Sequence, residues 1–164
     1  MISDKIKSRE ELVSIVTELK RQGKKIVFTN GCFDLLHMGH FRYLTEAKQH
    51  GDVLIVAANT DEMITRLKGP ERPIFSEEER QLILAAIEAV DYVTLFHEET
   101  PHRILNELKP DVLIKGGDYD VDGIVGHELV WSWGGEVKPL VLTPGASTRK
   151  VIQKILSRHK SDSS

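Results

Sequence analysis

The chain has 164 residues, of which 40% are hydrophobic and 29% are charged. This length and balance indicate one globular domain and exclude a disordered or fibrous chain. The net charge of −3, from 22 basic and 25 acidic side chains, argues against a protein that holds nucleic acid through phosphate contacts, so we expect no nucleic-acid partner.

The hydrophobic segments and the cysteine content indicate the compartment. The longest apolar runs have four to six residues, far short of the roughly 20 needed to span a bilayer, so we expect no membrane segment. The N-terminal stretch Met1–Lys5 lacks the apolar core of a secretory signal. Cys32 is the only cysteine and therefore forms no internal disulfide. Together these features predict a cytoplasmic protein.

Short β-branched runs alternate with longer amphipathic stretches along the chain. Ser8 and Glu11 have the spacing of a capping box, and the helical pattern that follows stops at Gly23, so residues 1–23 are predicted to form an N-terminal helix packed on the domain. Pro139 moves the last predicted strand towards a sheet edge. The predicted strands are 26–28, 53–58, 92–96, 112–114 and 137–142, and the further helices are at about 39–50, 60–67, 77–89, 100–108, 124–133 and 147–159.

This alternation predicts an α/β fold, a Rossmann-like doubly wound sheet of five parallel strands with helices on both faces. Residues 24–159 would form this single domain, and residues 160–164 are expected to be a disordered tail. Ligands of such sheets bind beyond the carboxyl ends of the strands, near the topological switch point. Function is therefore expected in the segments that follow the strands, at 29–40, 59–75, 115–123 and 143–149.

The segment Thr29–His40 is the most informative of these, because it links a strand to the start of a helix. Free backbone N–H groups at such a start favour an anion. His37 and His40 are three residues apart, so both rings can reach the same side and donate to a phosphate. We expect Gly39 to remove a side chain that would block the ligand. By spacing alone a surface histidine pair is an equal alternative, and no third ligand suggests a metal site.

This segment resembles the His-x-Gly-His signature of the nucleotidyltransferase superfamily, in its cytidylyltransferase-like branch. The resemblance covers residues 24–158. Within this branch, the sequence is most similar to the subgroup that adenylylates D-glycero-manno-heptose 1-phosphate. That activity occurs alone or fused to a sugar kinase, and the length of this chain favours the stand-alone form. The further matching motifs are Asn30-Gly31-Cys32-Phe33-Asp34, Asn59-Thr60-Asp61, Arg72-Pro73, Glu79-Arg80, Lys115-Gly116-Gly117-Asp118-Tyr119, Gly134-Gly135-Glu136-Val137 and Gly145-Ala146-Ser147-Thr148.

The resemblance implies attack by a sugar-phosphate oxygen on the α-phosphorus of a nucleoside triphosphate, with pyrophosphate leaving. His37 and His40 would hold the α-phosphate, and Mg²⁺ would be bound mainly through the triphosphate. Lys48 lies eight residues beyond His40 and would contact phosphates as a catalytic residue, the alternative being a surface lysine. The nucleotide cleft would be lined by Asn30, Gly31, Cys32, Phe33 and Gly39.

Two further segments are predicted to contact ligands. Lys115-Gly116-Gly117-Asp118 follows the fourth strand directly, and paired glycines allow close backbone approach. Lys115, Gly116 and Gly117 are assigned to the nucleotide and Asp118 to the second substrate, the alternative being a tight turn. Ser147 and Thr148 begin the last helix, so they either bind nucleotide phosphates or cap that helix.

Three more residues are assigned to the second substrate, each with an alternative. Asp34 is either a sugar-hydroxyl acceptor or a loop and helix cap. Lys68 lies in a glycine- and proline-containing segment where it closes on phosphate or remains a solvated charge. Arg80 binds the substrate phosphate or forms an ion pair with Glu77 or Asp61.

The expected substrates are therefore ATP and a sugar 1-phosphate, and relatives of this kind commonly form dimers or tetramers, so we expect a homo-oligomer. The rival is a cytidylyltransferase for glycerol 3-phosphate or a phospho-amino-alcohol. Those relatives carry an arginine where this chain has Leu142–Gly145, and they lack the counterpart of Lys115. A nucleotide-sensing scaffold without turnover is the alternative from another class.

Overall fold

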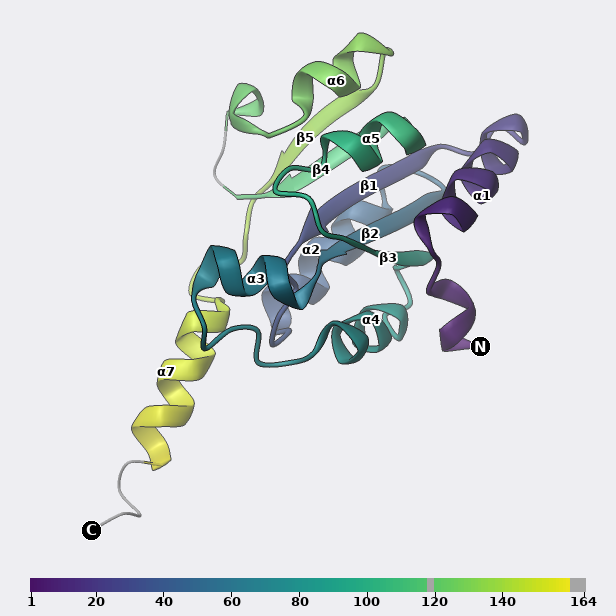
Figure 1. Ribbon diagram of the computed structural model, residues 1–164. Coiled ribbons are helices and arrows are strands. Elements are labelled where there is room, and N and C mark those ends of the chain that lie inside the picture. The colour runs from purple at the N-terminus through teal and green to yellow at the C-terminus, as the bar shows by residue number, and fades with distance from the viewer. Residues whose placement is uncertain (118–119, 160–164) are drawn as a thin grey trace.

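The computed structural model describes residues 1–117 and 120–159. In this part of the chain five parallel strands form one sheet in the order β3-β2-β1-β4-β5 (Figure 1). This confirms the predicted doubly wound α/β fold, and Pro139 does lie in an edge strand. The strands are β1 (Ile26–Gly31), β2 (Val53–Asn59), β3 (Tyr92–Phe96), β4 (Val112–Gly116) and β5 (Glu136–Leu140).

The helix starts follow the capping signals of the sequence. The Ser8 side chain accepts a hydrogen bond from the Glu11 backbone, and the Glu11 carboxylate accepts one from the Ser8 backbone. Ser76 and Glu79 form the same reciprocal pair, which satisfies backbone donors that a helix start leaves free. The helices are η1 (Ile2–Lys5), α1 (Arg9–Arg21), α2 (Met38–Lys48), α3 (Asp61–Lys68), α4 (Glu77–Ala85), α5 (His102–Leu108), η2 (Val121–Gly123), α6 (His127–Ser132) and α7 (Thr148–His159).

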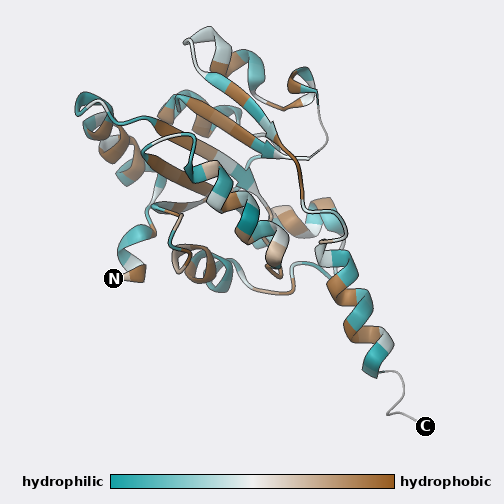
Figure 2. Ribbon diagram, turned by 180° about the vertical axis from the view of Figure 1, so that it is seen from behind, coloured by the Kyte–Doolittle hydropathy of each residue, from teal (hydrophilic) through white to brown (hydrophobic). Residues whose placement is uncertain are grey.

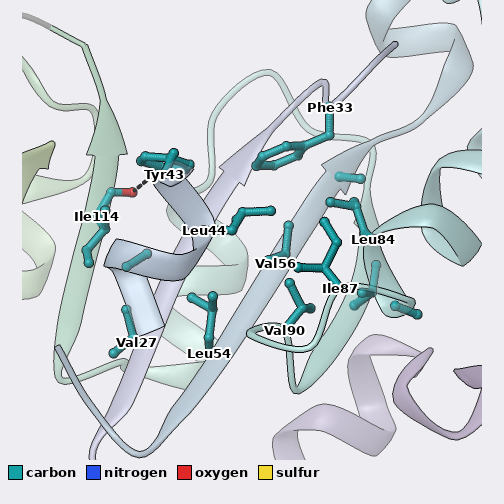
Figure 3. Close-up of a cluster of buried hydrophobic side chains, with 14 of the residues drawn as sticks. Val27, Phe33, Tyr43, Leu44, Leu54, Val56, Leu84, Ile87, Val90 and Ile114 are labelled. Atoms are coloured by element: carbon teal, nitrogen blue, oxygen red, sulfur yellow. Dashed lines mark hydrogen bonds between the residues drawn. The ribbon is translucent and has the colours of Figure 1, made fainter. Parts of the chain in front are cut away.

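Two apolar cores lie on the two faces of the sheet. One core joins the sheet to α2 and α4, and Figure 3 shows Leu44 and Leu84 of these helices beside Val56 of β2. The other core joins the sheet to α1, α5 and α6. Strand β2 is buried along its whole length, as expected for a central strand covered on both faces. Figure 2 shows these largely apolar strands between helices in which hydrophilic and hydrophobic residues alternate.

The N-terminal helix α1 packs on the second of these cores. Its residues Leu12 and Val16 are buried together with Ile104 and Leu105 of α5. Helix α7, by contrast, projects away from the sheet (Figure 1) and has no buried residue. Within the described residues, no helix combines the length and the apolar character needed to cross a membrane. The predicted tail 160–164 lies outside the described residues.

The site of greatest interest is the switch point between β1 and β4. The pairing of β1 with β2 continues to Gly31, whereas its pairing with β4 ends at Phe28 and Leu113. The carboxyl-terminal residues of β1 and β4 are therefore not joined to each other by a ladder. In a doubly wound sheet a separation of this kind is where a ligand binds.

Candidate active site

A cleft of about 820 Å³ opens at the carboxyl ends of β1 and β4. The start of α2, the end of α3 and the start of α7 contribute its walls. The cleft brings together twelve of the residues predicted from the sequence: Asn30, Gly31, Cys32, Phe33, His37, Gly39, His40, Lys68, Lys115, Gly116, Ser147 and Thr148. Other lining residues were not assigned there from the sequence: Tyr43, Arg72, Leu142, Thr143, Ala146, Arg149, Ile152 and Gln153.

The two histidines are held by the first turn of α2. His37 is the residue before the helix, and its Nδ1 accepts a hydrogen bond from the Gly39 backbone N–H at 3.1 Å. The Nδ1 of His40 accepts one from the His37 backbone N–H at 3.3 Å. A backbone N–H can only donate, so both Nδ1 atoms are unprotonated and each neutral ring carries its proton on Nε2. The ring centroids are 4.1 Å apart, so the pair presents two N–H donors side by side.

The surroundings keep both rings neutral. Burial lowers the pKa of His37. Burial, together with repulsion from a charge on His37, lowers the pKa of His40 to about 4. At neutral pH in the absence of a ligand, both side chains are therefore uncharged donors. A phosphate placed beside them would favour the protonated form, since a nearby opposite charge raises the pKa of a histidine.

Gly39 is required for a reason that differs from the sequence-based expectation. A Cβ on this residue would lie 2.9 Å from Cε1 of His37 and 3.1 Å from Cβ of Ala146. The space beside Gly39 is thus occupied by the protein's own histidine ring and by the start of the α7 segment. The glycine permits the His37 ring to fold back over the helix start, where its Nδ1 reaches the Gly39 N–H.

Lys115 projects from the end of β4 across to β1. Its Nζ donates to the carbonyl oxygen of Asn30 at 2.9 Å, and burial lowers its pKa. None of the ion pairs within residues 1–117 and 120–159 includes Lys115. A partly buried ammonium with no carboxylate partner in this part of the chain is suited to bind an anionic ligand.

The described lining of the cleft is cationic. Lys68, Arg72, Lys115 and Arg149 contribute to it, and it contains no aspartate or glutamate. The protein as a whole has a net charge of −3, so this is a local concentration of positive charge. Such a concentration attracts a polyanion without making the whole surface basic. Among the described residues, no group of three or more histidine, cysteine, aspartate or glutamate side chains gathers to hold a metal ion.

The residues at the start of α7 have structural hydrogen bonds as well as a place in the cleft. The Ser147 hydroxyl accepts from the Lys150 backbone N–H at 3.2 Å, which is a helix cap. The Thr148 hydroxyl donates to the carbonyl oxygen of Asp34 at 2.9 Å. Both hydroxyls are thus engaged, so these contacts agree with the capping alternative for Ser147 and add a tie between α7 and the Asp34 loop.

Asp34 does not face the cleft. Its buried carboxylate accepts from the backbone N–H groups of Ile74 at 2.8 Å and Phe75 at 3.0 Å, and from Arg72 Nε at 2.7 Å. Burial alone would raise its pKa, but these hydrogen bonds outweigh burial and lower the pKa. The assignment to a sugar hydroxyl is therefore wrong in this structure, because the carboxylate already anchors the loop that carries Arg72.

Arg80 was assigned to the substrate phosphate, and the structure corrects this. The side chain is fully buried and donates to Asp61 at 2.8 Å, to the Cys32 carbonyl at 2.7 Å and to the Phe75 carbonyl at 3.1 Å. The pair with Asp61 was the alternative interpretation. With its guanidinium engaged in these contacts, Arg80 supports the cleft loop from behind and is not one of the cleft residues.

Lys48 also lies outside the site. It is the last residue of α2, where it forms an ion pair with Asp91 and donates to the carbonyl oxygen of Asp52. These partners precede β3 and β2, at the end of the sheet opposite the cleft. Eight residues of helix separate Lys48 from His40 by about 12 Å, at roughly 1.5 Å per residue. A shared helix face is thus insufficient to bring the lysine to the histidines.

Two predicted residues remain at the margin. Gly117 is not among the cleft residues, and its backbone N–H donates to the Leu140 carbonyl at 3.0 Å. Its φ of 145° lies in the region that favours glycine, so the structure shows a backbone role. Asp118 lies outside the described residues.

Comparisons with known proteins show the family to which the chain belongs. The family model described as cytidylyltransferase-like matches residues 28–154, which include the described cleft residues and all of the sheet except Ile26 and Val27. The chain belongs to the cytidylyltransferase-like family. This confirms the resemblance seen in the sequence, and the chain carries a nucleotidyltransferase domain.

Curated relatives are longer than this chain. The bifunctional protein HldE of Geobacter metallireducens is 52% identical over 152 residues, covering 93% of this chain and 31% of the relative. The bifunctional protein HldE of Syntrophotalea carbinolica is 49% identical over 156 residues, covering 95% of this chain and 32% of the relative. The chain therefore spans about a third of the length of these relatives.

Two solved structures share the fold. A lipopolysaccharide core biosynthesis protein from Thermoplasma volcanium is 32% identical with a TM-score of 0.58, covering 74% of this chain and 98% of that one. A pantoate-beta-alanine ligase from Francisella tularensis has a TM-score of 0.60 at 17% identity, covering 90% of this chain and 72% of that one. The second likeness concerns the fold alone.

Proposed function

We propose that this domain is an adenylyltransferase that joins the AMP moiety of ATP to heptose 1-phosphate and releases pyrophosphate. The observation that carries the proposal is the pair of neutral Nε2–H donors on His37 and His40, in a cationic cleft beside Lys115. The choice of sugar is supported by the resemblance of the sequence to the heptose 1-phosphate subgroup. It is also supported by the HldE relatives and by the lipopolysaccharide core biosynthesis protein of similar structure.

The chemistry requires positioning and charge stabilisation more than a covalent catalyst. An oxygen of the acceptor phosphate attacks the α-phosphorus and forms a new P–O bond. The bond from the α-phosphorus to the oxygen that bridges it to the β-phosphorus breaks, and pyrophosphate leaves with that electron pair. Negative charge on the α-phosphate oxygens is then stabilised by hydrogen bonds from His37 and His40.

The remaining cations would receive the rest of the triphosphate. Lys115 at the end of β4 and Arg149 in the first turn of α7 both line the cleft. Backbone N–H groups and the helix dipole at the start of α7 also favour an anion. In this proposal ATP arrives as its magnesium complex. The described lining offers no carboxylate, so the residues present fit a magnesium ion held by phosphate oxygens and water.

A pyrophosphate-release assay tests the function directly. The wild-type protein would be supplied with ATP or CTP, and with heptose 1-phosphate or glycerol 3-phosphate. We expect the highest turnover with ATP and heptose 1-phosphate. Faster turnover with CTP and glycerol 3-phosphate would support the cytidylyltransferase instead, and absence of turnover with every pair would support a nucleotide-sensing scaffold.

The same assay tests the histidines. His37→Ala and His40→Ala should each lower turnover by about 10²–10³-fold, the usual effect of removing one preorganised donor from a developing charge. His97→Ala changes an exposed histidine that is not among the cleft residues and serves as the matched control. If either cleft variant keeps more than about a third of the wild-type turnover, the assigned roles are wrong.

Thermal unfolding gives an independent measure of base preference. With magnesium present, ATP should raise the melting temperature more than CTP at equal concentration, because a ligand that binds only the folded state stabilises it. Equal shifts, or a larger shift with CTP, would contradict the choice of ATP.

A further inference from the structure

A second cavity of about 490 Å³ adjoins the cleft. The two share a rim formed by Asn30, Gly31, Cys32, Lys68 and Lys115. From this rim the cleft extends towards α7, whereas the second cavity extends towards the ends of β2 and β3. The two lysines of the rim are therefore accessible from both sides, and a group bound there would contact ligands in both cavities. Residues that line the second cavity but not the cleft are Asn59, Leu67, Phe96, Glu99, Pro101, Gly123 and Val125, so its polar side chains outside the rim are Asn59 and Glu99.

Asn59, the last residue of β2, offers a hydrogen-bond donor to this cavity. The residue is only 5% exposed, and its Oδ1 lies 3.8 Å from the Cys32 thiol, which donates to it. Burial raises the pKa of that thiol and so keeps it protonated. In the described part of the chain, the Asn59 amide nitrogen has no hydrogen-bond partner. Every fully buried side-chain nitrogen in that part does have a partner, so the Asn59 nitrogen is not fully buried. This NH₂ group is therefore at least partly accessible, and because Asn59 lines the second cavity we infer that the group faces it.

Glu99 supplies an acceptor at the outer side of the same cavity. Its exposed carboxylate lies 3.4 Å from the Arg66 guanidinium and lines the cavity. Phe96 and Pro101 are buried and form apolar wall between these polar groups. The cavity thus has cations at the shared rim and, further out, one donor and one acceptor. This arrangement is complementary to a phosphorylated polyol, with its anion at the rim and its hydroxyls beyond.

The geometry of the reaction places the acceptor on this side. In a phosphoryl-type transfer the attacking and leaving oxygens lie roughly in line, on opposite sides of the phosphorus. The start of α7 in the cleft is the favourable place for the leaving pyrophosphate. The attacking oxygen must then approach from across the rim, where the second cavity lies.

We propose that the second cavity binds the acceptor sugar phosphate, with its phosphate at Lys68 and Lys115 and its hydroxyls on Asn59 and Glu99. Asn59 and Glu99 are then specificity-determining residues that contact the sugar and leave the nucleotide untouched. This assignment rests on the proposed function, because it locates the acceptor of that reaction.

Calorimetric titration of heptose 1-phosphate tests the assignment in the presence of magnesium and a non-hydrolysable ATP analogue. Asn59→Leu removes the donor at similar volume, and Glu99→Ala removes an exposed acceptor without disturbing the core. We expect about tenfold weaker acceptor binding in each variant, the effect of one lost hydrogen bond at a binding site. The affinity for the ATP analogue should stay within about twofold of the wild-type value. Asn106→Leu and Glu88→Ala alter exposed residues outside both the cleft and this cavity and are the matched controls.

The outcomes separate this assignment from the proposed function. Three results would each overturn the assignment. The first is unchanged acceptor affinity in both Glu99→Ala and Asn59→Leu, and the second is a loss of nucleotide affinity in these variants as large as the loss of acceptor affinity. The third is no binding of the acceptor by the wild type. If the wild type binds heptose 1-phosphate and the variants bind it more weakly, the assignment is supported. The proposed function fails separately if that same wild-type protein releases no pyrophosphate from ATP with this acceptor.

Discussion

The hydroxyl of Tyr43 donates a hydrogen bond to the carbonyl oxygen of Ile114 at 3.2 Å (Figure 3). The same hydroxyl lies 2.5 Å from Thr29 Oγ1. Tyr43 belongs to α2, Thr29 to β1 and Ile114 to β4, so one side chain joins three elements where the two strands part. Tyr43 lies one turn beyond His40, and Ile114 immediately precedes Lys115. The bond therefore fixes the histidine helix relative to the lysine strand.

Tyr43→Phe tests this positioning role. Burial raises the pKa of Tyr43, so the hydroxyl stays protonated and its loss leaves the Thr29 hydroxyl and the Ile114 carbonyl without this partner. We expect a stability loss of about 1–3 kcal/mol. We also expect the catalytic constant to fall by roughly tenfold or more, since small displacements of catalytic groups are costly.

A second variant separates positioning from stability. Adding Thr29→Val to Tyr43→Phe removes the orphaned hydroxyl, so the melting temperature should recover in part while the catalytic constant stays low. Thermal unfolding and steady-state kinetics measure the two effects. Turnover that recovers in step with the melting temperature would show that Tyr43 acts on stability alone.

The pKa of His40 predicts a specific dependence of stability on pH. The pKa of a histidine in the unfolded chain is about 6.5, and the pKa of His40 in the folded protein is about 4. Between these values the unfolded chain binds a proton that the folded ring does not, so the free energy of unfolding falls as pH decreases from 6.5 to 4. Above pH 6.5 this group should make no pH-dependent contribution. Between pH 6.5 and pH 4, the melting temperature of His40→Asn should therefore fall less than that of the wild type.

Nitrogen NMR of the His40 ring checks the same feature at the atomic level. The neutral form should carry its proton on Nε2, since Nδ1 accepts from the His37 backbone N–H. Bound ATP should move the titration midpoint upward, because phosphate favours the charged ring. A midpoint near 6.5 in the free protein, or a proton on Nδ1, would contradict the geometry of the helix start.

Lys115 and Lys68 should have different kinetic effects. Lys115 is held at a strand end by its bond to the Asn30 carbonyl, so we expect it to contact nucleotide throughout the reaction. Lys68 is exposed at the end of α3 and precedes Gly69, whose φ is 102°. Lys115→Ala should weaken ATP binding, whereas Lys68→Ala should leave ATP affinity unchanged, weaken acceptor binding and lower the catalytic constant. Unchanged ATP affinity in Lys115→Ala, measured by calorimetry, would reverse this assignment.

Lys48→Ala should leave turnover within about twofold of the wild-type value. The lysine contacts Asp91 and the Asp52 carbonyl at the opposite end of the sheet from the cleft. Both partners of the ion pair are partly exposed, so its loss should cost about 1 kcal/mol or less. If turnover falls strongly while the melting temperature stays unchanged, the contacts of Lys48 at one end of α2 must affect the position of the histidines at the other end.

The sequence by itself determined the order and type of strands β1 to β5 and helices α1 to α7, but not the short 3-10 helices η1 and η2. Helix starts were found from Ser8 and Ser76 because a capping box consists of bonds between residues three apart. The apolar run of β2 indicated a strand buried on both faces because side chains of a strand alternate between the two faces. His37 and His40 were placed at a strand-to-helix junction from local sequence alone, and the hydrogen-bond partners of their Nδ1 atoms lie in the same helix turn. Local bonds are readable from local sequence.

Only the tertiary structure decided which polar side chains face the cleft. Asp34 is bonded to residues about 40 positions away, and Arg80 to the Cys32 carbonyl 48 positions away. No periodicity reports such partners, so the sequence left a substrate role and a structural role open for each of the two residues. Tyr43 was missed because its role depends on two strands that diverge at their carboxyl ends. A side chain's function here depends on whether its hydrogen bonds are already satisfied inside the protein, and that is settled by contacts distant in sequence.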